Sequence, residues 1–215
     1  NTIPPITDSA AMEAYVSNIK QAAPSLRVLP TFRVMPHLTG SDIAELAKAG
    51  AVAGKFYPQG ATTNSEGGGD LWSCYNVFEA MADNGLVLSI HGEDPDAFVL
   101  DREAAFLPKV QRLIKDIPAL NIVLEHVSSK EGVEFIENAP DTVAATITAH
   151  HLRLTLDDLI GEDIIPHNFC KPVVKTPRDR EAIRKAAVHG DGKFFFGSDS
   201  APHPRSRKES ASGSA

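Results

Sequence analysis

The sequence predicts an α/β fold, a (β/α)8 barrel of the TIM type of which about six of the eight strands fall within these 215 residues. Three observations lead to this prediction. Short apolar runs alternate with helix-like segments, the apolar runs are continuous, and residues able to ligate metal stand at the ends of several runs. Continuous apolar runs are typical of parallel strands that are covered on both faces.

Strands and helices are expected to alternate about six times along the chain. The strands are expected at 27–35, 51–57, 86–91, 121–126, 143–148 and 194–198. The helices are expected at 8–22, 41–50, 70–85, 103–115, 130–138 and 177–188. Ser41, Asp42 and Asp70 are start signals, and Gly50 and Gly85 are stop signals. This order implies a parallel sheet with right-handed crossovers. The polar tail, 201–215, is predicted to be a loop.

Two architectures share this order of elements, a doubly wound open sheet and a (β/α)8 barrel. Lys55, His91, His126 and Asp199 stand at or near the ends of four predicted strands, with steps of 36, 35 and 73 residues between them. A barrel spends about 30 residues on each βα unit, so the steps are close to one, one and two units. All strand ends of a barrel open on one face, where active sites lie. No G-x-G-x-x-G motif follows any run, so a dinucleotide-binding open sheet has no support.

Composition indicates a single domain over residues 1–215 and narrows the classes of partner. The net charge is -7, 42% of the residues are apolar and 23% are charged. Nucleic-acid binding needs a basic face, which is not evident, and no apolar stretch approaches the length of about 18 residues that a membrane span needs. We therefore expect neither a nucleic-acid nor a membrane partner. The two cysteines, Cys74 and Cys170, fit a reducing, cytoplasmic location.

His91 and His126 end two adjacent predicted strands and are candidates for one metal site. A single histidine at a strand end is more often structural, but two at equivalent ends can bind one zinc ion through neutral imidazole nitrogens. Glu93 and Glu125 are carboxylates nearby. Glu125 precedes His126 in the predicted strand, so we expect its side chain on the other face, as a structural contact rather than a ligand.

Lys55 ends the apolar run AVAGKFYP and would place an ammonium group in the mouth of a barrel. One interpretation is a lysine whose stem packs on apolar surface or that pairs with a carboxylate. The other is a lysine whose neutral amine has reacted with CO2, which gives a carbamate anion whose two oxygens can bridge two metal ions. Two metals about 3.5–4 Å apart form a hydrolytic site.

Asp199, in FFFGSDSAPH, follows the last predicted strand. It is either a helix-capping or turn aspartate, or a metal ligand that also moves protons as general base and acid. His203 lies four residues further on and is either a surface residue or a contact for an anionic substrate. His150 and His151 are neighbours after another strand, and because adjacent side chains diverge we expect that they do not line one site together.

Four segments, GKFYPQGATTNS, IHGE, LEHV and FFGSDSAPHPRSRKES, resemble in this order the dihydroorotases of the type with a free-standing catalytic chain. The resemblance covers nearly all 215 residues at compatible spacings. Members of that family are metal-dependent amidohydrolases with a (β/α)8 barrel. The resemblance implies a hydrolase acting on cyclic amides, which converts N-carbamoyl-L-aspartate reversibly to L-dihydroorotate in de novo pyrimidine (UMP) biosynthesis.

The resemblance also implies a role for each matching residue. Lys55 would be the carbamylated lysine that bridges two zinc ions, with His91 and His126 as ligands of one of them. Asp199 would be a ligand of the other zinc ion and the catalytic base and acid. Substrate contacts would come from Asn1 and His203 at the carboxylate, the backbone of Lys171 and Ala215, and the mobile-loop residues Thr62 and Thr63.

One part of the family pattern is missing from these residues. The family's first strand carries H-x-H-x-R, with two zinc ligands and an arginine for the substrate carboxylate, and no H-x-H occurs here. We therefore expect residues 1–215 to be an internal fragment of a metal-dependent amidohydrolase barrel, without its first strands and its C-terminal end. Two alternatives stay open, another cyclic amidohydrolase such as a hydantoinase, and a catalytically silent barrel that serves as a scaffold. A homodimer is also left open.

Overall fold

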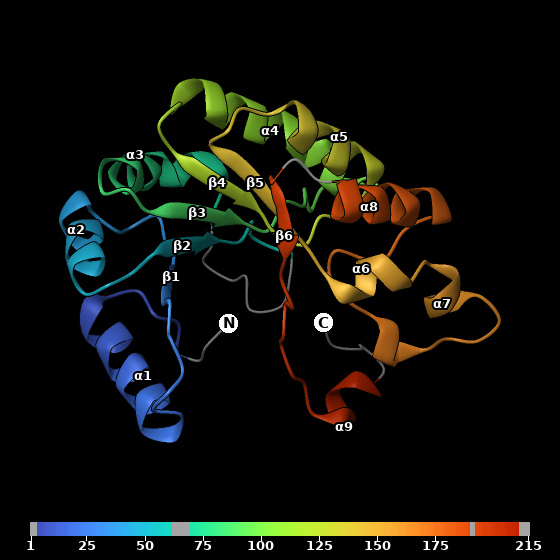
Figure 1. The fold of residues 1–215 in the computed structure, drawn as a ribbon, viewed down its shortest axis with the longest axis horizontal. Coiled ribbons are helices and arrows are strands. Elements are labelled where there is room, and N and C mark those ends of the chain that lie inside the picture. The colour runs from blue at the N-terminus through green and yellow to red at the C-terminus, as the bar shows by residue number, and fades with distance from the viewer. Residues whose placement is uncertain (1–3, 62–68, 190–191, 211–215) are drawn as a thin grey trace.

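The computed structural model describes residues 4–61, 69–189 and 192–210, and one six-stranded parallel sheet forms its centre (Figure 1). Each strand pairs in parallel with the next strand in the chain. The strands are β1 (Thr31–Arg33), β2 (Ala53–Phe56), β3 (Val87–Ile90), β4 (Asn121–Leu124), β5 (Val143–Ile147) and β6 (Phe194–Phe196). All six lie inside the predicted runs, so the strand prediction is confirmed.

The order of the strands separates the two architectures. A doubly wound sheet reverses its strand order at a switch point, whereas the strands of a barrel follow one another in chain order. The observed order, β1-β2-β3-β4-β5-β6, is that of a barrel. Within the described residues the sheet is not closed, and β1 and β6 are its edges. The predicted α/β class and the count of six barrel strands are confirmed.

The six predicted helices are present with small shifts at their ends. They are α1 (Ser9–Ala22), α2 (Gly40–Lys48), α3 (Tyr75–Asp83), α4 (Arg102–Asp116), α5 (Lys130–Asn138) and α8 (Pro177–His189). The helix predicted at 70–85 begins with a separate 3-10 turn, η1 (Leu71–Cys74). Helix α2 begins earlier than predicted because Thr39, and not Ser41, is its N-cap. The amide of Asp42 donates to Thr39 Oγ1, and the amide of Thr39 donates to Asp42 Oδ2.

Four short helices were not predicted. They are α6 (Ala149–Arg153), α7 (Asp157–Ile160), η2 (Pro166–Asn168) and α9 (Arg205–Lys208). Each has about one turn, which is too short for an apolar repeat to reveal. Helix α9 corrects the prediction that 201–215 is entirely loop, although residues 211–215 lie outside the described part of the chain.

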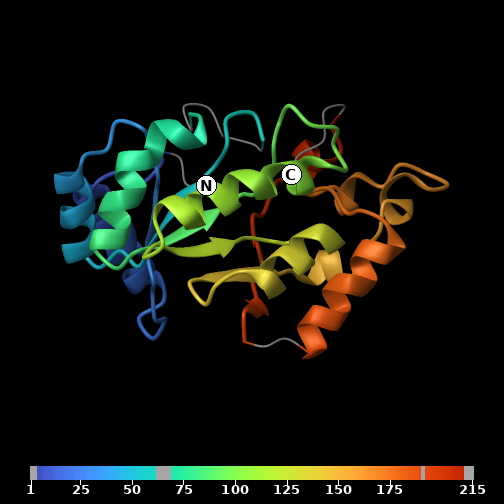
Figure 2. The ribbon, with the colours of Figure 1, turned by 90° about the horizontal axis from the view of Figure 1, so that it is seen from above.

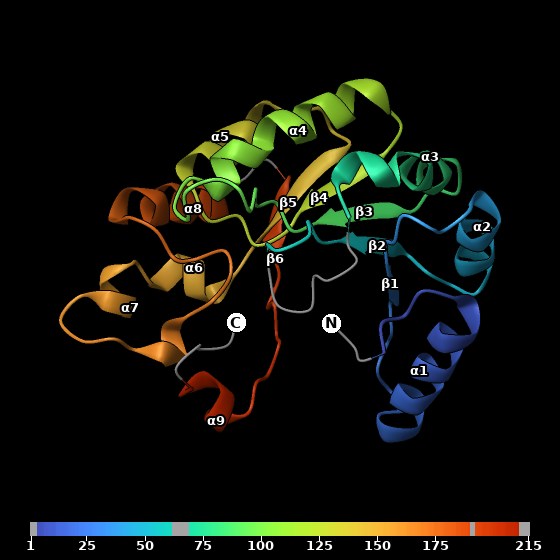
Figure 3. The ribbon, with the colours of Figure 1, turned by 180° about the vertical axis from the view of Figure 1, so that it is seen from behind.

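Helices α2, α3, α4, α5 and α8 form an arc around one face of the sheet (Figures 1 and 3). In the view from above, α4 and α5 lie over the strands and run roughly along them (Figure 2). The layer between this arc and the sheet is apolar and includes the fully buried Phe56, Phe78, Phe106, Met81 and Leu88. Each such side chain contributes about 1.5–3 kcal/mol on burial. This core holds the strands firmly enough that residues at their carboxyl ends have defined positions.

The structure bears on two expectations about the surroundings of the chain. Among the described residues, no helix is both long and apolar enough to span a membrane. Cys74 and Cys170 do not form a disulfide.

Candidate metal and active site

The carboxyl ends of β2, β3 and β4 bring three predicted metal-site residues to one edge of the sheet. Lys55 lies in β2, His91 follows β3 directly, and His126 is the second residue after β4. The amide of His91 donates to Phe56 O of β2 at 3.0 Å, so the sheet hydrogen bonding continues up to the histidine. Because parallel strands end at the same edge, the three side chains gather there.

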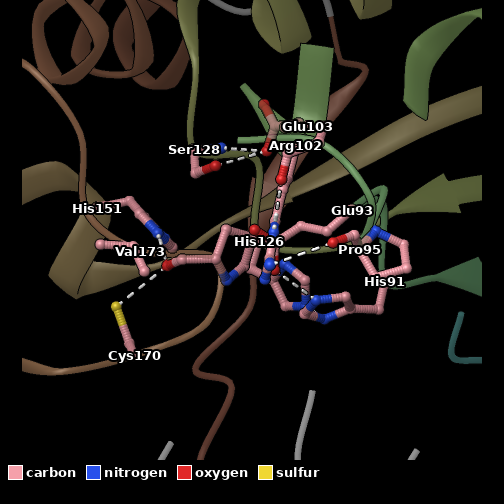
Figure 4. Close-up of polar contacts among 12 residues, drawn as sticks. His91, Glu93, Pro95, Arg102, Glu103, His126, Ser128, His151, Cys170 and Val173 are labelled. Atoms are coloured by element: carbon pink, nitrogen blue, oxygen red, sulfur yellow. Dashed lines mark hydrogen bonds and ion pairs between the residues drawn. The ribbon is translucent and has the colours of Figure 1, made fainter. Parts of the chain in front are cut away.

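The imidazole rings of His91 and His126 meet edge to face in a buried position, with their centres 4.7 Å apart (Figure 4). Nδ1 of His91 lies 3.1 Å from Nε2 of His126. The other ring nitrogen of His91, Nε2, lies 2.8 Å from Oε2 of the buried Glu93. A carboxylate on the second nitrogen of a histidine fixes the orientation of the ring, as it does for histidines that ligate zinc.

The environment of the two histidines suits a metal ion. Burial lowers the pKa of His91 and lowers the pKa of His126 well below its usual range, so both are neutral, the form that binds metal. Two nitrogens bound to one tetrahedral zinc ion lie about 3.3 Å apart, given Zn–N bonds of about 2.0–2.1 Å. The 3.1 Å between the facing nitrogens is close to that separation. The buried Nδ1 of His126 has no hydrogen-bond partner among the described residues.

Thr146 of β5 holds the backbone at His126. The amide of His126 donates to Thr146 Oγ1 at 2.6 Å, and the amide of Val127 donates to Thr146 O at 3.0 Å. The Thr146 hydroxyl in turn donates to Glu125 Oε2 at 2.7 Å. Glu125 therefore makes the structural contact expected of it. These contacts stabilise His126 at a φ of 45°, in the left-handed region that is unfavourable for most residues.

Lys55 is partly buried, and a hollow of about 340 Å³ between α1, β1 and the end of β2 opens beside it. Burial lowers the pKa of its amine, while the charges of Glu125 and Asp199 raise it. Its Nζ lies 5.3 Å from the centre of the Tyr57 ring. A lowered pKa increases the fraction of neutral amine, which is the form that reacts with CO2.

Asp199 follows β6 and is exposed, with a φ of 44°. Its charge acts on Lys55, and with burial as the larger cause it helps to raise the pKa of Tyr57 to about 12. Gly197 lets this end of β6 approach β5, because a Cβ there would lie 2.9 Å from the Cβ of Thr146. The carboxylate of Asp199 is thereby close enough to affect the lysine and histidine side of the site.

The rings of His150 and His151 lie together, with their centres 4.6 Å apart, so the expectation that they diverge is wrong. The two residues belong to α6 and not to an extended strand, and neighbours on a helix are only about 100° apart. One ligand atom each of His150, His151 and Cys170 lie within 4.8 Å of one another. Both nitrogens of the buried His151 are already engaged, with Thr148 Oγ1 at 2.8 Å and Pro172 O at 3.0 Å, so His151 has a structural role.

The predicted substrate contacts are only partly within the described residues. Lys171, before α8, and His203, before α9, are partly buried. Asn1, Thr62, Thr63 and Ala215 lie outside the described residues. The described geometry therefore covers the proposed metal ligands, and the substrate contacts stay predictions.

Two buried residues that support the site, Thr146 and Glu103, have no role in the predictions from the sequence. Thr146 lies in the apolar run 143–148, which is expected to be buried on both faces. A polar side chain in such a run is a signal for a buried hydrogen bond. Glu103 begins a predicted helix and looks like any exposed glutamate of a first turn. Its hydrogen-bond partners, Ser128 and Ser129, lie 25 and 26 residues away, so the local sequence gives no sign of them.

The chain is similar in sequence and structure to known proteins, and it matches a protein-family model. Curated dihydroorotases from Shewanella halifaxensis and Shewanella woodyi are each 43% identical over 222 residues, which covers all of this chain and 64% of theirs. A solved structure of dihydroorotase in complex with 5-fluoroorotic acid from Saccharomyces cerevisiae is 42% identical with a TM-score of 0.91, and the match covers 98% of this chain and 62% of that one. The chain thus spans a little under two thirds of the length of these relatives.

An L-hydantoinase from Arthrobacter aurescens has a TM-score of 0.77 at 21% identity over 97% of this chain and 50% of its own, which shows a common fold. The amidohydrolase family model matches residues 11–212. That match, together with the barrel order of the strands and the polar residues at their carboxyl ends, leads to one conclusion: the chain belongs to the amidohydrolase family.

Proposed function

We propose that this chain is the larger part of a dihydroorotase, which converts N-carbamoyl-L-aspartate reversibly to L-dihydroorotate in pyrimidine biosynthesis. The observation that carries the proposal is that Nδ1 of His91 and Nε2 of His126 lie 3.1 Å apart at the strand ends. The charges of Lys55 and Asp199 act on His91 at the same place. The similarity to dihydroorotases at 42–43% identity supports this substrate over others in the same family.

We infer that the site holds two zinc ions. His91 and His126 would bind one of them together with a carbamate on Lys55, and the same carbamate and Asp199 would bind the other. The neutral, facing imidazoles and the lowered pKa of the Lys55 amine support this arrangement. Bound zinc would polarise the ring carbonyl of the substrate and lower the pKa of a water molecule to about 7.

The chain's own residues then have separate tasks. In ring opening, the oxygen of water adds to the amide carbonyl carbon beside the ring methylene of L-dihydroorotate, and the bond from that carbon to the ring nitrogen breaks, which leaves the carbamoyl group on the aspartate product. Asp199 takes a proton from that water and delivers it to the leaving nitrogen. Glu93 keeps the ring of His91 aimed at the metal.

We propose that the residues predicted from the sequence to contact the substrate recognise it. Asn1 and His203 would contact its carboxylate, Lys171 and Ala215 would contact it through their backbones, and Thr62 and Thr63 would close over it. A homodimer and a cytoplasmic location stay predictions from the sequence.

Activity of the full-length protein tests the proposal. Purified protein loaded with zinc should open L-dihydroorotate and close N-carbamoyl-L-aspartate, and turnover of hydantoin should be at least about a hundredfold slower. Preference for hydantoin would favour the hydantoinase alternative. A folded protein that binds zinc but turns over neither compound would favour the scaffold alternative.

Zinc content tests the metal site apart from activity. His126→Asn should lose bound zinc, because the ring nitrogen that faces His91 is removed. The matched control is His167→Asn, which removes an exposed histidine of η2 and should leave zinc binding unchanged. Equal zinc content in wild type and His126→Asn would contradict the assignment of this ligand.

A further inference from the structure

Glu103, in the first turn of α4, is the most completely bonded carboxylate of the described chain that the reaction above does not use. It is 1% exposed. Its Oε2 accepts from the amide of Ser128 at 2.8 Å and from the Ser128 hydroxyl at 2.6 Å. Its Oε1 accepts from the amide of Ser129 at 2.9 Å and from the Ser129 hydroxyl at 2.5 Å. Figure 4 shows Glu103 and Ser128 joined by these contacts beside His126.

A buried lysine supplies the opposite charge. Nζ of Lys175, a residue that is 5% exposed, donates to the Ser128 hydroxyl at 2.6 Å. Burial raises the pKa of Glu103, and the ammonium of Lys175 together with the serine hydrogen bonds lowers it. The hydroxyl of Ser128 thus links a carboxylate and an ammonium that would each be costly to bury alone.

These contacts complete the fixation of the chain at His126. The amides of His126 and Val127 donate to Thr146, and the next two amides, those of Ser128 and Ser129, donate to Glu103. Four consecutive N–H groups, from His126 to Ser129, are therefore bound to fixed acceptors, two on Thr146 and two on Glu103. His126 has a positive φ, so its ring direction depends on both ends of this segment being held.

A carboxylate suits this position better than an amide. Both of its oxygens accept two hydrogen bonds each, and one donor on each oxygen is a backbone N–H that cannot turn. A glutamine would place an NH2 group against one of the two backbone N–H groups. Gly132 leaves room for the carboxylate, since a Cβ there would lie 2.2 Å from Glu103 Oε1.

We propose that Glu103, neutralised by Lys175, is a positioning residue that holds His126 in the orientation needed to bind zinc. The proposal rests on the proposed function, because it takes His126 to be a zinc ligand. A purely structural role for Glu103 would affect folding without a specific effect on the metal.

The test compares Glu103→Gln with wild type and with the control Glu131→Gln in the full-length protein. Glu131 is an exposed residue of the first turn of α5, so its variant makes the same chemical change outside the network. Zinc affinity is measured by competition with a chelator, and the Co²⁺-substituted protein is examined by visible absorption. We expect about 10–100-fold weaker zinc binding and an altered cobalt spectrum in Glu103→Gln, as for other residues that orient metal ligands. We expect neither change in the control.

A double variant separates positioning from stability. Glu103→Gln/Lys175→Met removes both charges, so its urea midpoint should recover toward wild type relative to Glu103→Gln alone. Its zinc affinity should stay low, because the backbone N–H still faces an amide. Recovery of both properties would overturn the proposal, as would zinc affinity within about twofold of wild type in Glu103→Gln.

Two further outcomes are informative. If Glu103→Gln does not fold, Ser128→Ala replaces it, with a several-fold loss of zinc affinity expected and an unchanged affinity overturning the proposal. A wild-type protein that binds no zinc would defeat the proposed function and this proposal with it. Normal zinc binding by Glu103→Gln in an active enzyme defeats this proposal alone.

Discussion

The site has two differently built sides. On one side His91 and His126 follow β3 and β4, strands that have a neighbour on each side, and both histidines are buried. Glu93 and Thr146 hold their ring or backbone through hydrogen bonds. On the other side Asp199 is exposed after β6, a strand at the edge of the described sheet.

Within the described residues, the difference follows the number of neighbouring strands at each position in the sheet. At the interior strand ends, the loop after β3 and the neighbouring strand β5 supply hydrogen-bond partners, Glu93 and Thr146. In the described residues β6 has only β5 beside it, and Phe196 in it is 66% exposed. Within the described residues the histidine side is therefore held by neighbouring segments, whereas Asp199 acts on Lys55 and His91 through its charge.

The largest effect is expected from Lys55, because it connects the two sides. Lys55→Ala should lower kcat by about 10³-fold or more, since loss of the bridging anion removes several kcal/mol of stabilisation. Turnover of L-dihydroorotate by the full-length protein measures this loss. Acetate or propionate, which can supply a bridging carboxylate, should restore part of the activity. Near-normal activity of Lys55→Ala would show that the lysine does not connect the two sides.

A smaller effect should separate the histidine side from the aspartate side. Glu93→Ala should weaken zinc binding by about 10–100-fold, because Nε2 of His91 loses its partner. Asp199→Asn should lower kcat while the His91–His126 site keeps its zinc, because the ring nitrogens of His91 lie against His126 and Glu93 and not against Asp199. Chelator competition measures the zinc affinity of both variants, and steady-state kinetics measure their kcat. Similar affinities of the two variants for the zinc ion at His91 and His126, counted apart from the ion that Asp199 would bind, would contradict the comparison.

Much of the fold was predictable because it depends on local patterns. Continuous apolar runs identified all six strands, and capping residues and glycines marked two of the six longer helices, although the N-cap of α2 proved to be Thr39. The spacing of Lys55, His91, His126 and Asp199 favoured a barrel over a doubly wound sheet, which the strand order confirms. These signals are local or regularly spaced, so one sequence is enough to find them.

The supporting residues were not predictable because they depend on contacts between distant segments. Glu103 and Lys175 meet Ser128 from positions 25 and 47 residues away. His150 and His151 were placed wrongly because the one-turn helix α6 cannot be seen in the sequence pattern. The sequence patterns thus indicate which residues gather at the strand ends, and tertiary packing decides which side chains hold them.

Substitution of Thr146 tests how much β5 stabilises the backbone at His126. Thr146→Val should lower the free energy of unfolding by about 1–3 kcal/mol, because the buried amide of His126 loses its acceptor. Thr146→Ser keeps the hydroxyl and is the control. Urea unfolding of the full-length variants measures the difference. Equal stability of the valine and serine variants would mean that the hydroxyl contributes nothing to this side.

The smallest effect concerns pH and the buried histidines. Burial lowers the pKa of His151 to about 3, and it also lowers those of His91 and His126, while the unfolded chain has histidines near about 6.5. Between these values the unfolded state binds protons that the folded state does not. Stability is therefore constant with respect to these groups above about pH 6.5 and falls as the pH decreases below it. Each histidine contributes a slope of at most about 1.4 kcal/mol per pH unit.

His151→Gln isolates one of these contributions without touching the proposed metal ligands. The loss of the Thr148 and Pro172 hydrogen bonds lowers stability at every pH, so the informative quantity is the slope and not the midpoint. Below pH 6.5 the free energy of unfolding of the variant should fall less steeply with decreasing pH than that of wild type. The reason is that unfolding of the variant takes up about one proton fewer. Urea unfolding of the metal-free, full-length protein between pH 5 and pH 8 measures both slopes, and chelation keeps zinc release from adding its own pH dependence. Identical slopes would mean that His151 is protonated in the folded state, contrary to its burial between two hydrogen-bond partners.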